Sequence, residues 1–167
     1  MNKIRKSYSL LVLLICMNAS TAMAAPFQQG SQQVSIVAGS GSAYGDNYII
    51  LGAGYGYYLI KGLELGINAQ FWLNGDPSIS KVSPQIKYVF TQPKTVRPYV
   101  GAFYSRTYTE GLEDLDSIGY RAGLYFMGKG NTFFGAGVAY EDYQDCTETV
   151  YTSCSETYPE ILFSFSM

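Results

Sequence analysis

The sequence predicts an all-β fold, an eight-stranded antiparallel up-and-down transmembrane β-barrel. Segments of about ten residues alternate between apolar and polar side chains, and clusters of Gly, Pro, Asn or Asp separate them. One face of the segments is almost purely apolar, whereas the other mixes small residues with isolated charges, as in a barrel with a polar interior. The segment length suits tilted strands that cross a bilayer, which take about 9–11 residues.

The chain begins with a predicted export signal. Three basic residues precede a short apolar run at 10–17, and residues 22–24 give the small-x-small pattern of a cleavage site. We expect residues 1–24 to be a cleaved signal peptide and residues 25–167 to form the barrel domain. A retained helix is the alternative, but the run is shorter than the roughly 20 residues that span a bilayer. Cys16 raises the possibility of a lipoprotein, although its neighbours lack the small residues that such sites favour.

Charge and cysteine content agree with export. Three of the 11 basic residues and none of the 13 acidic residues lie in 1–24, so the mature chain has a net charge of −5. An acidic chain of this kind is a poor candidate for binding nucleic acid. Cys146 and Cys154 are the two cysteines of the mature part, and an oxidising periplasm would pair them as a disulfide.

Eight segments carry the alternation. We expect strands at 33–44, 47–59, 63–73, 79–90, 98–108, 117–127, 132–143 and 155–167. In the segment 63–73, for example, odd-numbered residues are apolar, and the opposite face includes Glu64, Asn68 and Gln70. The strands of a soluble β-sandwich also alternate, so the pattern alone does not show whether the apolar face contacts lipid or the core of a soluble protein.

Aromatic residues gather near both ends of the segments, as the girdles of membrane barrels do. We expect one rim to contain Tyr57, Tyr88, Phe90, Tyr99, Phe126 and Phe133, and the other Phe71, Tyr104, Tyr108, Tyr120, Tyr140 and Tyr143.

The connections differ in charge. Those at 60–62, 91–97 and 128–131 contain basic residues and no acid, whereas those at 74–78, 109–116 and 144–154 contain acidic residues and no base. Short turns of such barrels face the periplasm and longer loops face outward. The split predicts basic turns inside and acidic loops outside.

Residues 161–167 resemble the C-terminal assembly signal of bacterial outer-membrane barrels, although the chain ends in Met167 where an aromatic residue is usual. Residues 97–102 and 119–123 look like strand motifs of the small-barrel superfamily that includes the OmpX-, OmpW- and OmpA-type domains. The resemblance covers the mature chain and implies a bacterial outer-membrane location. The partners it implies are outer-membrane lipid and lipopolysaccharide, periplasmic chaperones and the barrel-assembly machinery, with the barrel a monomer.

No enzyme activity is predicted. Enzymes among the small outer-membrane barrels rely on a histidine base, and the chain has no histidine. Glu141 and Asp142 are adjacent and so point to opposite faces of a strand. We expect no cofactor and no metal site. The acidic stretch 110–116 could hold Ca²⁺ through its oxygens, or could be a solvated loop.

The predicted interior contains a charge network of Glu64, Lys87, Arg121, Glu141 and Glu160, with Arg121 as the expected partner of Glu141. Other side chains expected to point inward are Asn68, Gln70, Gln85, Ser105, Tyr125 and Ser164. Two interpretations stay open: a packed polar plug, or a passage left by the many inward glycines.

The function predicted from these features is a structural, adhesive or stress-protective surface role through acidic external loops, with a possible host or surface ligand. A narrow channel or carrier for small molecules is the alternative, and a soluble lipocalin-like barrel in the periplasm is a third class. The loop between Cys146 and Cys154 could present Tyr and Thr for recognition, or could be bridged only against proteolysis.

Overall fold

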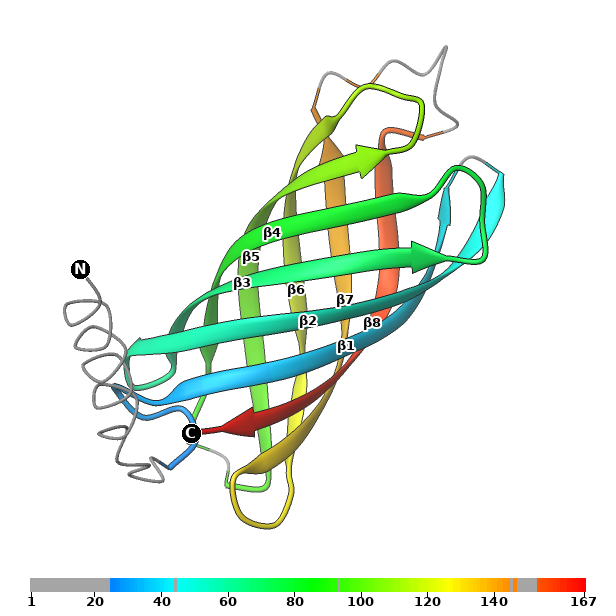
Figure 1. Ribbon diagram of the computed structural model, residues 1–167. Helices are drawn as coiled ribbons and strands as arrows, with labels where there is room; N and C mark the ends of the chain where they lie inside the picture. Colours follow the sequence, from blue (N-terminus) through cyan, green and yellow to red (C-terminus); the bar gives the residue numbers. More distant parts are fainter. Residues whose placement is uncertain (1–24, 44, 93, 145, 147–152) are drawn as a thin grey trace, which may run out of the picture.

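The computed structural model describes residues 25–43, 45–92, 94–144, 146 and 153–167. The predicted signal peptide at 1–24 lies outside the described residues. The strands, labelled in Figure 1, are β1 Gln32–Ala43, β2 Asp46–Ile60, β3 Leu63–Leu73, β4 Ile79–Val89, β5 Val96–Thr109, β6 Leu115–Met127, β7 Thr132–Tyr143 and β8 Ser155–Ser166. The predicted ranges 63–73 and 132–143 are correct at both ends, and the largest error is the start of β5 and β6, each two residues earlier than predicted.

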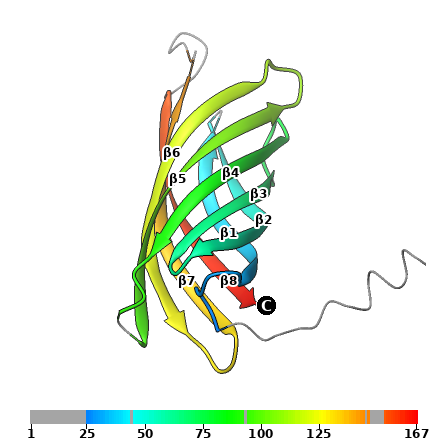
Figure 2. The ribbon, with the colours of Figure 1, turned by 90° about the vertical axis from the view of Figure 1, so that its left-hand side faces the viewer.

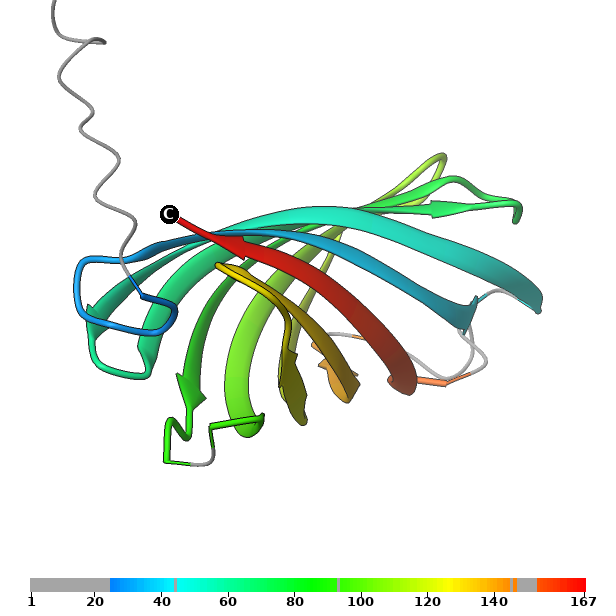
Figure 3. The same ribbon diagram turned by 90° about the horizontal axis from the view of Figure 1, so that it is seen from below.

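The eight strands form a closed antiparallel barrel in sequence order, which confirms the predicted fold class. Each strand pairs with the next, and β1 pairs with β8 from Gln33 opposite Ser166 to Gly39 opposite Glu160. The strands are tilted and coil around the barrel, as seen from the side and from below (Figures 2 and 3). Closure leaves no strand edge unpaired, so every strand has neighbours on both sides.

The two faces of the wall differ in polarity, as the alternation predicts. Large apolar side chains are exposed on the outside of all eight strands; Val138 in β7, for example, is 53% exposed. The inside carries most of the buried polar and charged side chains. An exposed apolar surface of this extent is unusual for a protein in water and suits a lipid environment.

The outward direction predicted for the aromatic rim residues is confirmed in part. Nine of the twelve predicted rim residues are exposed on the outside. The prediction is wrong for Tyr99 and Phe133, because both side chains are 1% exposed and face the interior. Tyr143 also faces inward, where its hydroxyl accepts a hydrogen bond from Lys81.

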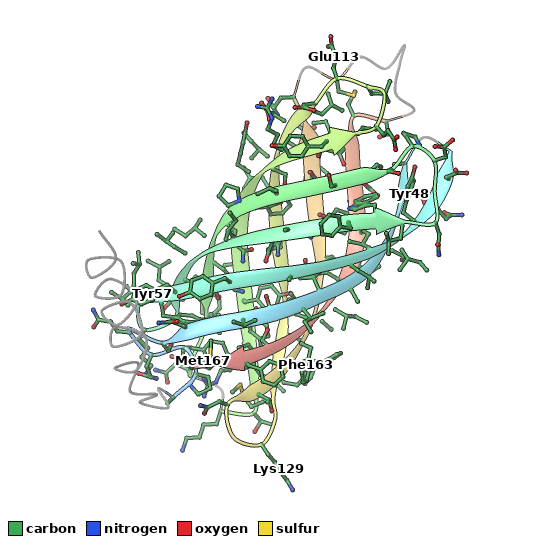
Figure 4. The ribbon with its side chains drawn as sticks, in the orientation of Figure 1. Tyr48, Tyr57, Glu113, Lys129, Phe163 and Met167 are labelled. Atoms are coloured by element: carbon green, nitrogen blue, oxygen red, sulfur yellow. A yellow bond between two sulfur atoms is a disulfide. The ribbon has the colours of Figure 1, made fainter. Side chains whose placement is uncertain are left out.

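The two ends of the barrel carry opposite charge. One end, here called the basic end, contains the connections β2–β3, β4–β5 and β6–β7. The other, the acidic end, contains the connections β1–β2, β3–β4, β5–β6 and β7–β8. Figure 4 shows Lys129 and Glu113 at opposite ends of the molecule. The chain's C-terminus lies at the basic end beside the start of β1, where Gln32 and Met167 exchange backbone hydrogen bonds of 2.9 and 2.8 Å.

In the part of the chain that the structure describes, there is no helix of the length and apolar character needed to cross a membrane. The same residues contain no group of three or more His, Cys, Asp or Glu side chains that could hold a metal ion.

Candidate functional site

The basic end is closed from inside by the segment that precedes β1. Phe27 is fully buried, and its ring lies 4.7 Å from that of Phe133, 5.6 Å from that of Tyr58 and 5.7 Å from that of Tyr125. The guanidinium of Arg97 lies 4.9 Å from the same ring. Phe27 has a φ of 68°, which a bulky residue adopts only where surrounding contacts hold it.

Backbone hydrogen bonds fix this segment across the barrel end. The amide of Gly62 donates to the carbonyl of Phe27 (2.9 Å), and that of Gly30 donates to the carbonyl of Tyr58 (2.9 Å). Further inside, the rings of Tyr99 and Tyr125 stack at 4.5 Å. The basic end therefore has an aromatic plug made of Phe27, Tyr58, Tyr99, Tyr125 and Phe133.

Above the plug lies the first ion pair. Lys87 Nζ is 3.0 Å from Glu64 Oε2, and both side chains are buried. The two residues are directly opposite each other on β4 and β3. Lys87 also donates to the Tyr125 hydroxyl at 2.7 Å, and Gln85 donates to Glu64 at 3.5 Å. Two members of the predicted charge network are thus partners.

The second pair joins strands that are not neighbours. Arg121 Nη1 on β6 lies 3.4 Å from Glu160 Oε2 on β8, and Tyr99 donates its hydroxyl to Glu160 at 3.1 Å. The predicted pairing of Arg121 with Glu141 is therefore wrong. The guanidinium of Arg121 lies over the ring of Phe103, at 4.6 Å.

Glu141 pairs instead with Lys81, a residue that the predicted network omits. Lys81 Nζ on β4 lies 2.9 Å from Glu141 Oε2 on β7 and 2.6 Å from the hydroxyl of Tyr143. Ser117 and Tyr158 also donate to Glu141. A signal for Lys81 was present in the sequence: it is six residues before Lys87, and an even spacing along a strand places both on one face.

The Lys81 ammonium is enclosed by aromatic rings. It lies 4.4 Å from the centroid of the Trp72 ring, 4.9 Å from that of Tyr143 and 5.9 Å from that of Tyr158. Cation–π contacts of this kind stabilise a desolvated ammonium. Trp72 and Tyr158 belong to a buried apolar cluster in the acidic half of the barrel, which also contains Tyr48, Ile50, Ile79, Phe103 and Ala139.

A pocket of about 370 Å³ opens above this cluster at the acidic end. Trp72, Ile79 and Leu115 provide apolar lining, whereas Lys81 and Glu156 provide charge. Glu156 is a second inward residue that the predicted network omits; its spacing of four from Glu160 places both on the inner face of β8. The remaining lining residues are Ser42, Ala43, Gly45, Asp46, Asn47, Thr107, Tyr143, Cys146, Ser153 and Ser155.

The disulfide predicted between Cys146 and Cys154 is present in the structure and lies beside this pocket. Its ends are anchored to the wall, because the amide of Tyr143 donates to the Cys154 carbonyl (2.9 Å) and that of Gln144 donates to the Asp116 carbonyl (2.8 Å). The loop residues 147–152, to which the predicted recognition role refers, lie outside the described residues.

Several buried polar atoms inside the barrel have no hydrogen-bond partner within the described residues. They include Trp72 Nε1, Thr107 Oγ1, Gln85 Oε1, both side-chain polar atoms of Asn68, and Nε and Nη2 of Arg121. Buried atoms of this kind generally bond to ordered water or to a ligand. The interior therefore contains polar atoms that remain available to water or to a small ligand.

Fold and interior together define a class: small, closed up-and-down barrels with an apolar exterior and a charged, largely filled interior. No family model matches the chain, and no curated protein matches it in sequence. In structure the chain is similar to the N-terminal β-barrel domain of OprF from Pseudomonas aeruginosa, with a TM-score of 0.68 and 17% identity, over 83% of this chain and 98% of that one.

Two further solved structures are similar. Neisserial surface protein A has a TM-score of 0.59 and 14% identity, over 81% of this chain and 95% of its own. Ail, the attachment invasion locus protein of Yersinia pestis, has a TM-score of 0.53 and 16% identity, over 84% of this chain and 100% of its own. These matches confirm the resemblance to small outer-membrane barrels at the level of the fold.

Proposed function

We propose that the chain is an outer-membrane protein that spans the membrane as a monomeric barrel and acts at the cell surface through its acidic end. The observation that carries this proposal is the inverted polarity of the wall, apolar outside and charged inside. The same inversion argues against a soluble lipocalin-like barrel, whose exterior would face water. Outer-membrane lipid and lipopolysaccharide are the partners that such an exterior fits.

The surface role follows from the asymmetry of the two ends. The aromatic plug around Phe27 closes the basic end, whereas the acidic end keeps a pocket and the disulfide-anchored loop. Outer-membrane barrels have their longer loops on the outside, and the longest connection of this chain, between β7 and β8, is at the acidic end, which supports an outward-facing acidic end. The names of two similar structures, a surface protein and an attachment invasion locus protein, support a role in structure or adhesion.

The experiment that tests location and sidedness labels cysteines on intact cells. Glu113→Cys and Lys129→Cys place exposed thiols at opposite ends of the barrel (Figure 4). A membrane-impermeant maleimide is expected to label the Glu113→Cys protein on intact cells, and the Lys129→Cys protein only after lysis. The reverse pattern would overturn the sidedness. A product that fractionates as soluble and keeps one gel mobility before and after boiling would overturn the membrane location.

A second experiment separates adhesion from a purely structural role. Deleting residues 146–154 is expected to abolish any binding of cells to surfaces while leaving the heat-dependent gel mobility of the barrel. Unchanged adhesion after the deletion would move the role away from this loop.

A narrow channel is the second candidate, because the interior contains buried polar atoms without protein partners. With the aromatic plug seated, we expect planar bilayers that contain the folded protein to be silent. Steady openings whose conductance changes in Lys87→Ala and Arg121→Ala variants would favour the channel over the surface role.

A further inference from the structure

The pocket at the acidic end contains an acidic side chain that the interior ion pairs leave over. Lys81, the basic residue of the pocket, is already bound to Glu141 and Tyr143. Glu156 lies directly opposite Glu141 in the β7–β8 register. Three basic side chains in the interior thus form ion pairs with three acidic ones, and Glu156 is a fourth acidic side chain, which has no such pair.

The carboxylate of Glu156 has partners too few and too weak for a charge in this position. Its Oε1 accepts a hydrogen bond from the backbone amide of Ser42 at 3.0 Å, and its Oε2 lies 3.5 Å from the hydroxyl of Tyr143. No ion pair joins it to a basic side chain in the described part of the chain. The ammonium of Lys81 is near but is bound to Glu141, so Glu156 has no basic side chain paired directly with it, and such a partly buried carboxylate favours a cation from outside.

Two more atoms of the same pocket lack partners. Thr107 and Trp72 are 4% and 2% exposed, and Thr107 Oγ1 and Trp72 Nε1 have no hydrogen-bond partner within the described residues. Both residues line the pocket together with Glu156. Buried polar atoms of this kind, gathered at one pocket, are typical of a place that binds a molecule.

The lining also sets the size and shape of that molecule. Trp72, Ile79 and Leu115 offer an apolar surface, and the volume of about 370 Å³ lies at the lower end of the range for small-molecule sites, about 300–1,000 Å³. An anion would meet Glu156 and the exposed carboxylate of Asp46, which is a second acid of the lining. A neutral apolar molecule would cover Glu156 without neutralising it, which is unfavourable.

We propose that this pocket binds a small organic cation, with its ammonium group at Glu156 and its apolar body against Trp72, Ile79 and Leu115. The inference deepens the proposed surface function and rests on it for one point, that the acidic end faces the outside. The acidic loops around the pocket raise the local concentration of cations, because charge of one sign steers ligands of the other.

Three probes of nearly equal shape test the charge preference: cyclohexylmethylamine, the neutral cyclohexylmethanol, and the anion cyclohexanecarboxylate. Binding to the purified, folded protein, from whichever cell fraction contains it, is measured by calorimetry, with the emission of Trp72, the single tryptophan of the chain, as a second readout from the pocket itself. We expect the amine to bind and to shift the emission, and the alcohol and the carboxylate to bind at least about tenfold more weakly, as expected when a charge-assisted hydrogen bond is missing.

Glu156→Gln removes the proposed counter-charge and keeps the side chain's size. We expect this variant to bind the amine about tenfold more weakly and the alcohol unchanged. Asp142→Asn is the matched control, since it removes one negative charge from an exposed residue near the same end that does not line the pocket. It is expected to change amine binding less than about twofold, because exposed charges act weakly at a distance.

Equal binding of the amine and the alcohol to the unsubstituted protein would overturn the proposal, and this comparison needs no variant to fold. No binding of any probe would overturn it as well. Equal losses in Glu156→Gln and Asp142→Asn would show general attraction by the acidic end and would also refute a site at Glu156. None of these results depends on membrane location, so failure here is distinguishable from failure of the labelling experiment on cells.

Discussion

Replacing Lys87 with Met tests whether the buried charges of Lys87 and Glu64 depend on each other for stability. Lys87 and Glu64 are 3% and 1% exposed, with 3.0 Å between their charged atoms. Without the ammonium, the Glu64 carboxylate loses its ion pair, and the hydrogen bond that it accepts from Gln85 is long, at 3.5 Å. Removing one partner of a buried ion pair generally costs about 3–5 kcal/mol of unfolding free energy, because the remaining charge stays buried without compensation. We expect Lys87→Met to fall in this range.

The double variant Lys87→Met/Glu64→Gln removes both charges and separates this effect from lost packing. Replacing a buried ion pair by uncharged side chains of similar volume often changes the stability little. We therefore expect the double variant to recover most of the unfolding free energy that the single variant loses. Urea unfolding in phosphatidylcholine vesicles, followed by the emission of Trp72, measures all three proteins. Lys61→Met, at an exposed turn, is the control and should stay within about 0.5 kcal/mol. A single variant that costs less than about 1 kcal/mol, or a double variant as unstable as the single, would refute the pairing argument.

Three further substitutions test other parts of the barrel by the same unfolding measurement. Phe27→Ala removes the centre of the aromatic plug and should cost about 3–5 kcal/mol; a loss below about 1 kcal/mol would mean that the segment before β1 is not part of the folded barrel. Val138→Arg places a charge on the middle of the outer face and should cost about 2–4 kcal/mol in a bilayer; a negligible cost would contradict the lipid-facing assignment. Cys146→Ser with Cys154→Ser opens a ring with a sequence separation of 8 residues. By the chain-entropy argument it should cost about 2–3 kcal/mol, and unchanged stability would show that the bridge does not restrict the unfolded chain.

The faces of the strands were predictable because side chains in a strand alternate with a period of two. Once one inward residue of β4 is known, the alternation also assigns Lys81 and Lys87 to the inner face, whatever the exact ends of the strand. The closed barrel was also predictable, since repeated alternation with turns between segments leaves few other arrangements. The same rule would have corrected Tyr99, which shares its face of β5 with Phe103 and Ser105. Tyr99 was assigned to the rim because it lies near the end of a segment. A residue can belong to an outer rim only if its side chain also points outward.

The partners of the interior charges were not predictable in the same way. Glu64 and Lys87 are opposite each other on neighbouring strands, so a correct hairpin register would have joined them. Arg121 and Glu160 lie on β6 and β8, and Lys81 and Glu141 on β4 and β7. Contacts across a barrel depend on its tilt and stagger, which set the height of each residue and do not appear in the alternation. Phe27 lies before the first strand and belongs to no periodic pattern.

The position of Glu156 has a physical reason that sequence analysis can use. Charges in the closed part of a narrow barrel must be paired, because water is too scarce there to solvate them. An acidic side chain that forms no ion pair with a basic one is tolerated only where solvent or a ligand reaches it. The basic end is filled by Phe27, so the acidic end is the place left for such a residue, and Glu156 lines the pocket there. An interior acid that forms no ion pair with a basic side chain is therefore expected at the open mouth of the barrel, where it can select the charge of what binds.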